Sequence, residues 1–288
     1  MSGDYTTYIR FDPEQDGTVY EKNKDFVREL PPEVYKTTPG EVDAADILAG
    51  IVGPGAMNAA AANNDIALLE RVLNNGGEIE GEFNRITPLS TAVRNNSIDA
   101  IKFLLEQGAD VDFKDKQGRS AITFCKTIEA TALMLERGAE IDTDVYGETL
   151  IHTVAGGYLN YEEDLLDFVI EKGAKPNLQS EQGLTALHIA AMKGKVNNLS
   201  KLIDAGWDIN VPDNRGRTAL HFSVDRCVPS STFDRGPVVE KLVNLGMDPD
   251  SEDKDGISAR DLAKKNAKAN RLGEREREQI IRVLNISI

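Results

Sequence analysis

One short sequence pattern returns along most of this chain of 288 residues. At its clearest, Thr185-Ala186-Leu187-His188 opens a unit and Ala205-Gly206 closes it. The closing glycines are Gly108, Gly138, Gly173, Gly206 and Gly246, and a second series precedes the openings at Gly118, Gly147, Gly183, Gly216 and Gly256. Two glycine series that share a period of about 33 residues mark a repeated structural unit. Such units stack into a solenoid, because none of them can bury its apolar face alone.

The unit resembles the ankyrin repeat, which has this period and a Thr-Pro-Leu-His type of opening. Thr87-Pro88-Leu89, Thr149-Leu150-Ile151-His152 and Thr218-Ala219-Leu220-His221 are similar to that opening. The resemblance implies an all-α ankyrin-repeat solenoid built of helix-turn-helix plus hairpin units. We expect an ankyrin repeat domain at 56–288 with about seven repeats, of which the end repeats are degenerate. The first to seventh units lie at approximately 56–82, 83–114, 115–143, 144–179, 180–212, 213–252 and 253–288.

Each part of the unit has a physical reason. A threonine hydroxyl such as that of Thr185 caps the first helix, and Pro88 fits a first turn, where no amide proton is needed. The closing glycine suits the left-handed conformation that ends a helix. In the second helix, Ile98, Ile101 and Leu105 recur at spacings of three and four, which marks one buried face.

Residues 1–55 lie outside the period and are expected to form a short non-repeat N-terminal segment. Two short apolar stretches, 7–11 and 18–20, flank a turn-like sequence and predict a hairpin. The segment also holds more aromatic residues than a plain disordered tail. We expect it to pack partly on the first units, and a partner-binding arm is the alternative.

The composition excludes several classes of protein. A net charge of −15 argues against a nucleic acid partner, which needs a basic surface. No apolar run reaches the roughly 18 residues of a membrane span, and the first residues lack the pattern of a secretory signal. Two cysteines, Cys125 and Cys227, are too few for a disulfide framework. We therefore expect no membrane partner and a cytoplasmic location, with the nucleus also open if the source is eukaryotic. We further expect a monomer.

The three histidines, His152, His188 and His221, occupy one slot in successive units. The resemblance implies a structural role there, in which the imidazole bridges backbone groups of neighbouring units. The chain lacks the spacings of a zinc protease, a phosphate loop or a nucleophile elbow. The sequence therefore predicts no catalytic residue, no metal site, no cofactor and no enzymatic activity.

In the ankyrin family the hairpin tips and the first helices form a concave binding side. Transferred by repeat position, this implies partner-binding candidates at Arg119, Tyr146, Glu148, Gln182, Met192, Arg215, Arg217 and Arg226. Arg94, Lys126 and Glu181 occupy equivalent tips or helix ends.

Three units depart from the common length between their two helices. Gly118 to Gly138 is 20 residues, against 23 from Gly183 to Gly206, so the third unit has lost about one helical turn. The fourth and sixth units gain residues, which bring Tyr158, Tyr161 and Phe233. Hot spots of protein interfaces are enriched in aromatic residues of this kind, so these three are candidate contacts for a partner. The alternative is that the additions are tolerated surface loops.

The function expected from these features is a non-enzymatic protein-protein interaction module, a scaffold or adaptor that binds another protein. A dedicated inhibitor or immunity-type protein that neutralises one enzyme or toxin is the alternative. A third and more distant alternative is an enzyme or regulatory subunit with residues 1–55 in its site. Asn210 resembles a hairpin asparagine that some eukaryotic ankyrin proteins have hydroxylated, and a purely structural role is its alternative.

Overall fold

The computed structural model describes residues 55–116, 118–143, 147–157, 161–225, 234–269 and 273–287. The chain divides into two compact units, Met1–Gly53 and Pro54–Ile288. All described residues belong to the second. The expectations for the N-terminal segment therefore lie outside the described residues.

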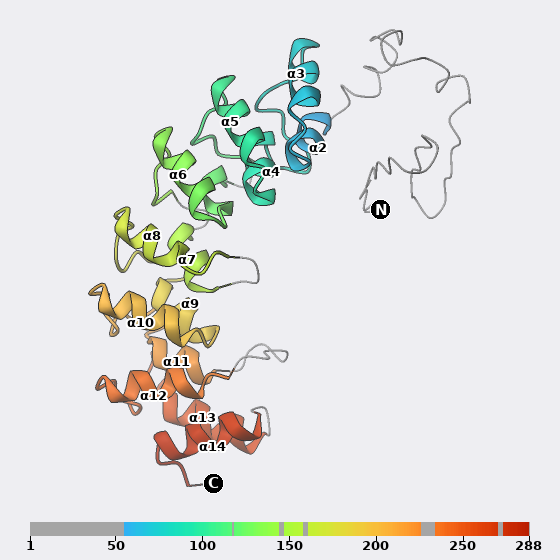
Figure 1. Ribbon diagram of the computed structural model, residues 1–288. Helices are drawn as coiled ribbons and strands as arrows, with labels where there is room; N and C mark the ends of the chain where they lie inside the picture. Colours follow the sequence, from blue (N-terminus) through green and yellow to red (C-terminus); the bar gives the residue numbers. More distant parts are fainter. Residues whose placement is uncertain are drawn as a thin grey trace, which may run out of the picture. The chain divides into compact units, whose positions relative to one another are not determined.

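Within the described part of Pro54–Ile288, the regular elements are helices that follow one another in pairs (Figure 1). The first helices of the pairs are α2 (Ala56–Ala62), α4 (Pro88–Asn95), the 3-10 helix η2 (Ala121–Phe124), α7 (Leu150–Ala155), α9 (Ala186–Met192), α11 (Ala219–Val224) and α13 (Ala259–Lys268). The second helices are α3 (Ile66–Asn74), α5 (Ile98–Glu106), α6 (Ile128–Glu136), α8 (Leu165–Glu171), α10 (Val196–Asp204), α12 (Gly236–Asn244) and α14 (Glu274–Val283). We call the first set the inner row and the second set the outer row.

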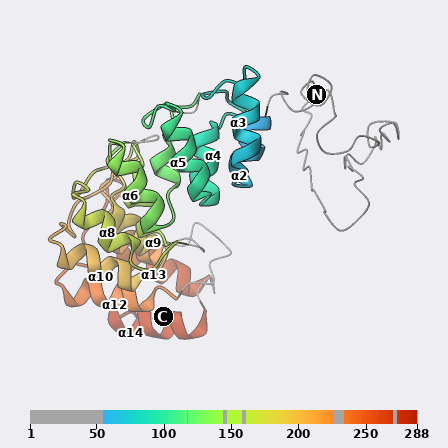
Figure 2. The same cartoon turned by 45° about the horizontal axis from the view of Figure 1, so that its top comes forward.

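Within each row, the helices of successive pairs contact one another (Figures 1 and 2). Each inner helix contacts the inner helix of the next pair, as α9 does with α11, and outer helices such as α10 and α12 do the same. Isolated bridges, Phe83 with Ile86 and Glu252 with Ser258, occur in the connections. The predicted all-α solenoid is confirmed.

The helix ends form from local sequence. Thr87 Oγ accepts a hydrogen bond from the N–H of Ser90 at 3.1 Å, and Pro88 is the first residue of α4. Gly206 has a φ of +88°, the left-handed conformation that a side chain disfavours. These caps satisfy polar groups that the short helices leave unpaired at their ends.

Between the two rows runs a continuous apolar core. Leu104, Leu150, Leu187 and Leu199 are fully buried side chains from both rows, and Trp207 is buried beside the closing glycine of the fifth unit. Burying each such leucine contributes about 1.5–3 kcal/mol. Neighbouring units supply this burial for one another, so each unit depends on the next for its stability.

The third unit is shortened in its first helix. η2 has four residues, where the equivalent α9 has seven. Its C-cap, Cys125, is fully buried, and burial raises the pKa of the Cys125 thiol to about 12. The loss was expected between the two helices, but it lies in the first helix, because the connection from η2 to α6 (125–127) is as long as that from α9 to α10 (193–195).

None of the helices in the described ranges combines the length and the apolar character that crossing a bilayer requires.

Candidate functional site

A groove of about 620 Å³ lies along the inner row, from the second to the fifth unit. We call it the inner groove. Its lining residues are Arg94, Arg119, Thr123, Phe124, Lys126, Glu148, Thr153, Tyr161, Glu181 and Gln182. Four of the predicted partner-binding residues, Arg119, Glu148, Tyr161 and Gln182, are thus brought together. They come from three successive units, the third to the fifth, which the stacking of the inner row places side by side.

One end of the inner groove is cationic. Arg94 lies in the last turn of α4 and is exposed, and Lys126 follows η2 and is half-buried. Lys126 Nζ donates a hydrogen bond to the main-chain carbonyl of Arg94 at 2.8 Å, which joins the second and third units. Among the described residues, no carboxylate forms an ion pair with either side chain. Two positive charges are therefore available to a ligand at this end.

A third cation, Arg119, is held in place by the chain itself. Its Nε lies 2.8 Å from Oδ2 of the buried Asp115, and its NH2 donates to the carbonyl of Arg85 at 2.8 Å. The guanidinium carbon lies 5.3 Å from the centre of the Phe124 ring. Arg119 therefore forms part of a fixed groove wall, with Phe124 stacked against it.

The other end of the inner groove is anionic. Glu148 precedes the capping residue of α7 and is half-buried, and Glu181 is exposed in the turn before α9. Neither carboxylate forms an ion pair within the described ranges. The groove thus carries opposite charges at its two ends, with Phe124 and Tyr161 among the residues that line it.

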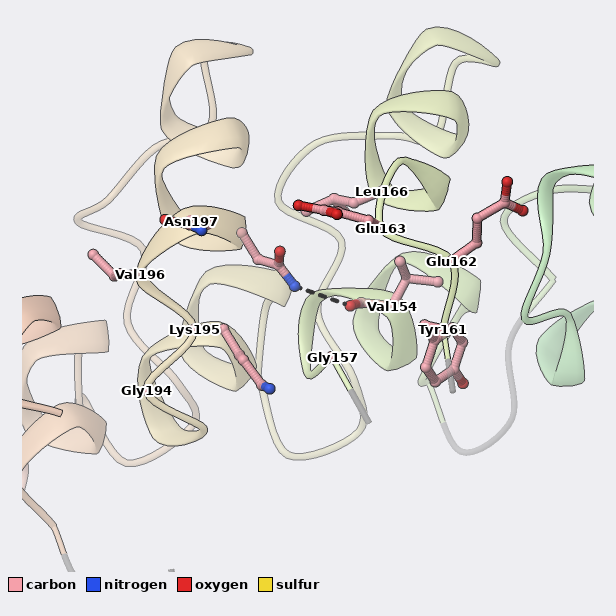
Figure 3. Close-up of a pocket in the computed structure, with 11 residues that line it drawn as sticks. Val154, Gly157, Tyr161, Glu162, Glu163, Leu166, Gly194, Lys195, Val196 and Asn197 are labelled. Carbon is pink, nitrogen blue, oxygen red and sulfur yellow. Dashed lines mark hydrogen bonds between the residues drawn. The ribbon is translucent and has the colours of Figure 1, made fainter. Parts of the chain in front are cut away.

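Tyr161 also lines a second, smaller cavity of about 300 Å³ (Figure 3). This cavity lies beside the ends of α7 and the start of α10, where Asn198 Nδ2 donates to the carbonyls of Val154 and Ala155 at 3.3 and 3.1 Å. In Figure 3, Lys195 and Tyr161 lie on either side of Gly157. Tyr161 therefore lines both the inner groove and this second cavity.

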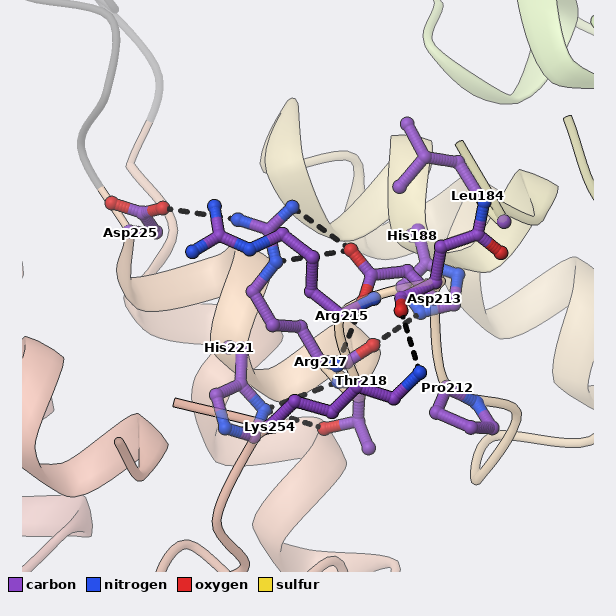
Figure 4. A network of polar contacts seen from close by, with 12 residues as sticks. Leu184, His188, Pro212, Asp213, Arg215, Arg217, Thr218, His221, Asp225 and Lys254 are labelled. Atoms are coloured by element: carbon purple, nitrogen blue, oxygen red, sulfur yellow. Dashed lines mark hydrogen bonds and ion pairs between the residues drawn. The ribbon is translucent and has the colours of Figure 1, made fainter. Parts of the chain in front are cut away.

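The two described candidates of the sixth unit, Arg215 and Arg217, form ion pairs within the chain (Figure 4). Arg217 forms hydrogen bonds to Asp213 at 2.8 and 3.0 Å and lies 3.7 Å from Asp225, and its guanidinium carbon is 4.3 Å from the ring centre of Phe222. Arg215 pairs with Asp255 of the seventh unit. Both cations are therefore already paired with carboxylates, unlike Arg94 and Lys126.

Met192 belongs to an apolar cluster at the inner row. It packs, partly buried, against Leu184, Ile189 and Phe222, which are 6 to 8% exposed. The cluster joins the fifth and sixth units, so Met192 contributes to packing between them.

The three histidines have a structural role, since each bridges two units. His152 Nε2 is 3.0 Å from the carbonyl of Leu184, and His221 Nε2 is 3.2 Å from that of Ile257. Burial is the main cause that lowers the pKa of all three imidazoles, to about 4 for His188, while the hydrogen bonds that the rings form to main-chain carbonyls raise it. The imidazoles are therefore neutral at pH 7, and their ring nitrogens form hydrogen bonds within the fold.

Asn210 is exposed, and its main-chain N–H donates to Asp208 Oδ1 at 2.8 Å. In the preceding units the equivalent side chains reach the next hairpin: Asp142 accepts from the N–H of Lys175, and Asn177 from that of Asp208, both at 3.1 Å. The amide of Asn210 forms no such bond to a described residue. Its modification stays a prediction.

Four predicted residues, Tyr146, Tyr158, Arg226 and Phe233, lie outside the described residues. Within the described ranges, no group of histidine, cysteine and carboxylate side chains is placed to hold a metal ion.

Sequence reasoning did not select three residues that line the inner groove, Thr123, Phe124 and Thr153. The signal was present for Phe124, because it occupies the slot of Ile189 and Phe222 in the repeat alignment.

Comparison with known proteins identifies the repeat. The family model described as "Ankyrin repeats (3 copies)" matches residues 56–144 and 150–253, which is more than half of the chain. Human Rabankyrin-5 is 26% identical over 232 residues, 69% of this chain and 18% of that protein. Human SH3 and multiple ankyrin repeat domains protein 2 is 32% identical over 160 residues, 52% of this chain and 8% of that protein. The chain thus spans less than a fifth of either relative.

Two solved structures have the same fold. The ankyrin repeat domain of human ASB11 has a TM-score of 0.63 at 19% identity and covers 79% of this chain and 96% of its own. The ankyrin repeat domain of Bcl-3, a member of the IkappaB protein family, has a TM-score of 0.59 at 19% identity, with 80% and 97% covered. With more than half of its residues matched by the family model, this chain belongs to the ankyrin repeat family.

Proposed function

We propose that this chain is a non-enzymatic module that binds another protein in the inner groove. Ankyrin repeats in general mediate protein-protein interaction, and the ankyrin fold is generally non-enzymatic. The observation that carries the proposal is the groove lining, where unpaired charges of both signs lie beside Phe124 and Tyr161. Aromatic and arginine side chains of this kind supply most of the energy of protein interfaces.

The walls of the groove are preformed. Arg119 is fixed by Asp115, Arg85 and Phe124, and Lys126 by the carbonyl of Arg94. A partner that docks on such a surface loses little free energy to ordering side chains, so more of the contact energy appears as affinity.

Affinity capture with a paired set of variants tests the proposal. The full chain and the groove variant Phe124→Ala/Tyr161→Ala are used as baits in an extract of the native source, with bound proteins quantified by mass spectrometry. The matched control is Phe103→Ala/Phe168→Ala, which removes two half-buried aromatic side chains from the outer row. We expect the groove variant alone to lose captured proteins. Equal capture by all three folded baits would reject the inner groove as the binding site.

We propose the scaffold or adaptor role for this module, with a dedicated inhibitor as the second candidate. The open shape and mixed charge of the groove suit a surface that several partners share. The same capture experiment separates the two, since an adaptor returns several partners of modest affinity. A single partner bound tightly at equal stoichiometry would favour the inhibitor.

We also propose a cytoplasmic monomer. The buried free thiol of Cys125 suits a reducing compartment. Cell fractionation of the native source tests the location, and light scattering coupled to size-exclusion chromatography tests the monomer. A dimer mass at micromolar concentration would contradict the second expectation.

A further inference from the structure

The inner groove is polarised along its length, and this polarity specifies the chemistry of its ligand. Resting on the proposed function, we infer that the groove binds an extended segment of a partner protein that carries a carboxylate at one end and a cation at the other. The carboxylate lies between Arg94 and Lys126, and the cation between Glu148 and Glu181. Apolar side chains of the segment lie between them, against Phe124 and Tyr161.

The charges that select this segment are those that the fold leaves unused. The cations at the hairpin tip of the sixth unit, Arg215 and Arg217, are paired with carboxylates of the chain. Arg94 and Lys126 have no such partner among the described residues, and neither do Glu148 and Glu181. A protein segment with complementary charges would compensate all four.

A segment with charge of only one sign would not satisfy the groove. An acidic segment would meet Arg94 and Lys126 but would place its other carboxylates beside Glu148 and Glu181, and a basic segment would have the reverse conflict. Like charges held close together oppose binding, which makes the groove selective as well as attractive.

The spacing of the two charges follows from the stacking of the inner row. Neighbouring helices pack about 8–10 Å apart, so the two steps from the cationic to the anionic end cover on the order of 20 Å. An extended chain advances about 3.3 Å per residue, which separates the two complementary charges by about six residues.

Binding of synthetic peptides to the full chain tests this inference. Three fluorescein-labelled peptides share leucines between two positions about six residues apart. Those positions hold Asp and Lys in the mixed probe, Asp twice in the acidic probe and Lys twice in the basic probe. Fluorescence anisotropy is expected to give the mixed probe an affinity on the order of tenfold above the other two. The preference is expected to shrink at high salt, which screens exposed charges.

Charge-reversal variants make the test specific. In Arg94→Glu/Lys126→Glu the basic probe is expected to bind best, and in Glu148→Lys/Glu181→Lys the acidic probe. The fourfold variant with both reversals keeps the net charge and is expected to prefer the mixed probe again. The control variants Arg71→Glu/Lys102→Glu and Glu70→Lys/Glu136→Lys make the same changes on the outer row and should leave the original order.

Two results would overturn the inference. The first is an equal affinity for all three probes, or no detectable binding of any probe at millimolar concentration. The second is an order of affinity that the groove reversals do not change. The outcome is separate from that of the proposed function. If Phe124→Ala/Tyr161→Ala still loses captured proteins while the probes show no charge preference, the groove binds proteins but does not select by this polarity.

Discussion

The imidazole of His188 joins the fifth unit to the sixth, with Nε2 3.1 Å from the main-chain carbonyl oxygen of Arg217. Its Nδ1 accepts a hydrogen bond from the N–H of Thr185 at 3.0 Å. Because Nδ1 accepts, Nε2 carries the proton and donates it to the carbonyl. One neutral side chain thus caps its own helix and connects two units.

Replacing His188 with alanine should therefore destabilise the fold without touching the inner groove. The change leaves the buried carbonyl of Arg217 without this donor and removes the ring that packs edge-on against Phe222 at 5.2 Å. We expect a loss of about 2–4 kcal/mol in the free energy of unfolding. Urea denaturation followed by circular dichroism measures it, with the exposed Glu136→Ala as control. A loss no larger than that of the control would contradict the bridging role.

The same burial predicts how stability depends on pH. Burial lowers the pKa of His188 from 6.5 in the unfolded chain to about 4 in the fold. Between these values the unfolded state binds more protons, so stability is complete above pH 6.5 and falls as the pH drops toward 4. One such histidine accounts for a loss of about 3 kcal/mol across this window.

Urea denaturation at several pH values from 7.5 to 4.5 measures this slope in the wild type and in His188→Gln. The glutamine does not titrate, so the variant should lose less stability over the window. His152 and His221 have pKa values lowered in the same direction and continue to contribute. Parallel slopes in the two proteins would show that His188 is not the source.

The repeat and its caps were predictable from sequence because their causes are local. Thr87, Pro88 and Gly206 act within one helix end, and the pattern that places them repeats along the chain. The shortened third unit was predicted for the same reason. The interval from Gly118 to Gly138 contains η2, α6 and the connection between them, so it showed the loss but not its place, which the structure assigns to η2.

The state of each site residue was not predictable in the same way. Arg119 and Arg217 occupy the same place in their units, and both are held by an aspartate four residues earlier. Arg215 is neutralised by Asp255, which lies 40 residues away in the sequence. The first two pairs are local, but the stacking of units decides pairs such as Arg215 with Asp255, so sequence position selected the candidate surface but not all of the charges left unpaired on it.

Cys125 should resist modification in the folded chain. It is fully buried, and burial raises the pKa of its thiol to about 12, so almost no thiolate is present at pH 8. In a Cys227→Ser background, we expect labelling by a maleimide reagent only when the chain unfolds or opens. Mass spectrometry against time in buffer and in urea measures this. Rapid labelling without denaturant would mean that the third unit opens readily.

The buried side chain of Arg235 should stabilise the last two units. Its NH1 donates to the carbonyl of Asp225 at 2.9 Å, and its main-chain N–H donates to Glu276 of α14 at 3.2 Å. The Arg235 side chain is buried, so Arg235→Ala removes the hydrogen bond to the Asp225 carbonyl and leaves a cavity, while the main-chain bond to Glu276 remains. We expect a loss of about 2–4 kcal/mol in the free energy of unfolding. Hydrogen exchange should show faster exchange in α12 and α14 than in α4, whereas a uniform change would contradict a local clamp.

Gly183 and Gly206 have nearly the same backbone conformation, but only Gly183 lies against a neighbouring unit. Replacing each with alanine therefore distinguishes backbone strain from a clash between units. Gly183 and Gly206 have φ values of +80° and +88°, so alanine at either position adds strain of about 1–2 kcal/mol. A methyl group at Gly206 meets nothing within 4 Å, but one at Gly183 would lie 2.4 Å from the main-chain nitrogen of Asn214. That nitrogen donates to the carbonyl of Gln182 at 3.2 Å and ties the tips of the fifth and sixth units together.

Gly183→Ala should therefore cost more stability than Gly206→Ala, by about 1–3 kcal/mol of overpacking. Because the clash falls between two units, it should also speed hydrogen exchange at the amides of the sixth unit, which Gly206→Ala leaves unchanged. Urea denaturation and hydrogen exchange of the two variants provide the comparison. Equal losses would mean that the tips separate at no cost, and that the stack is held by its helices and its histidine bridges rather than by its hairpins.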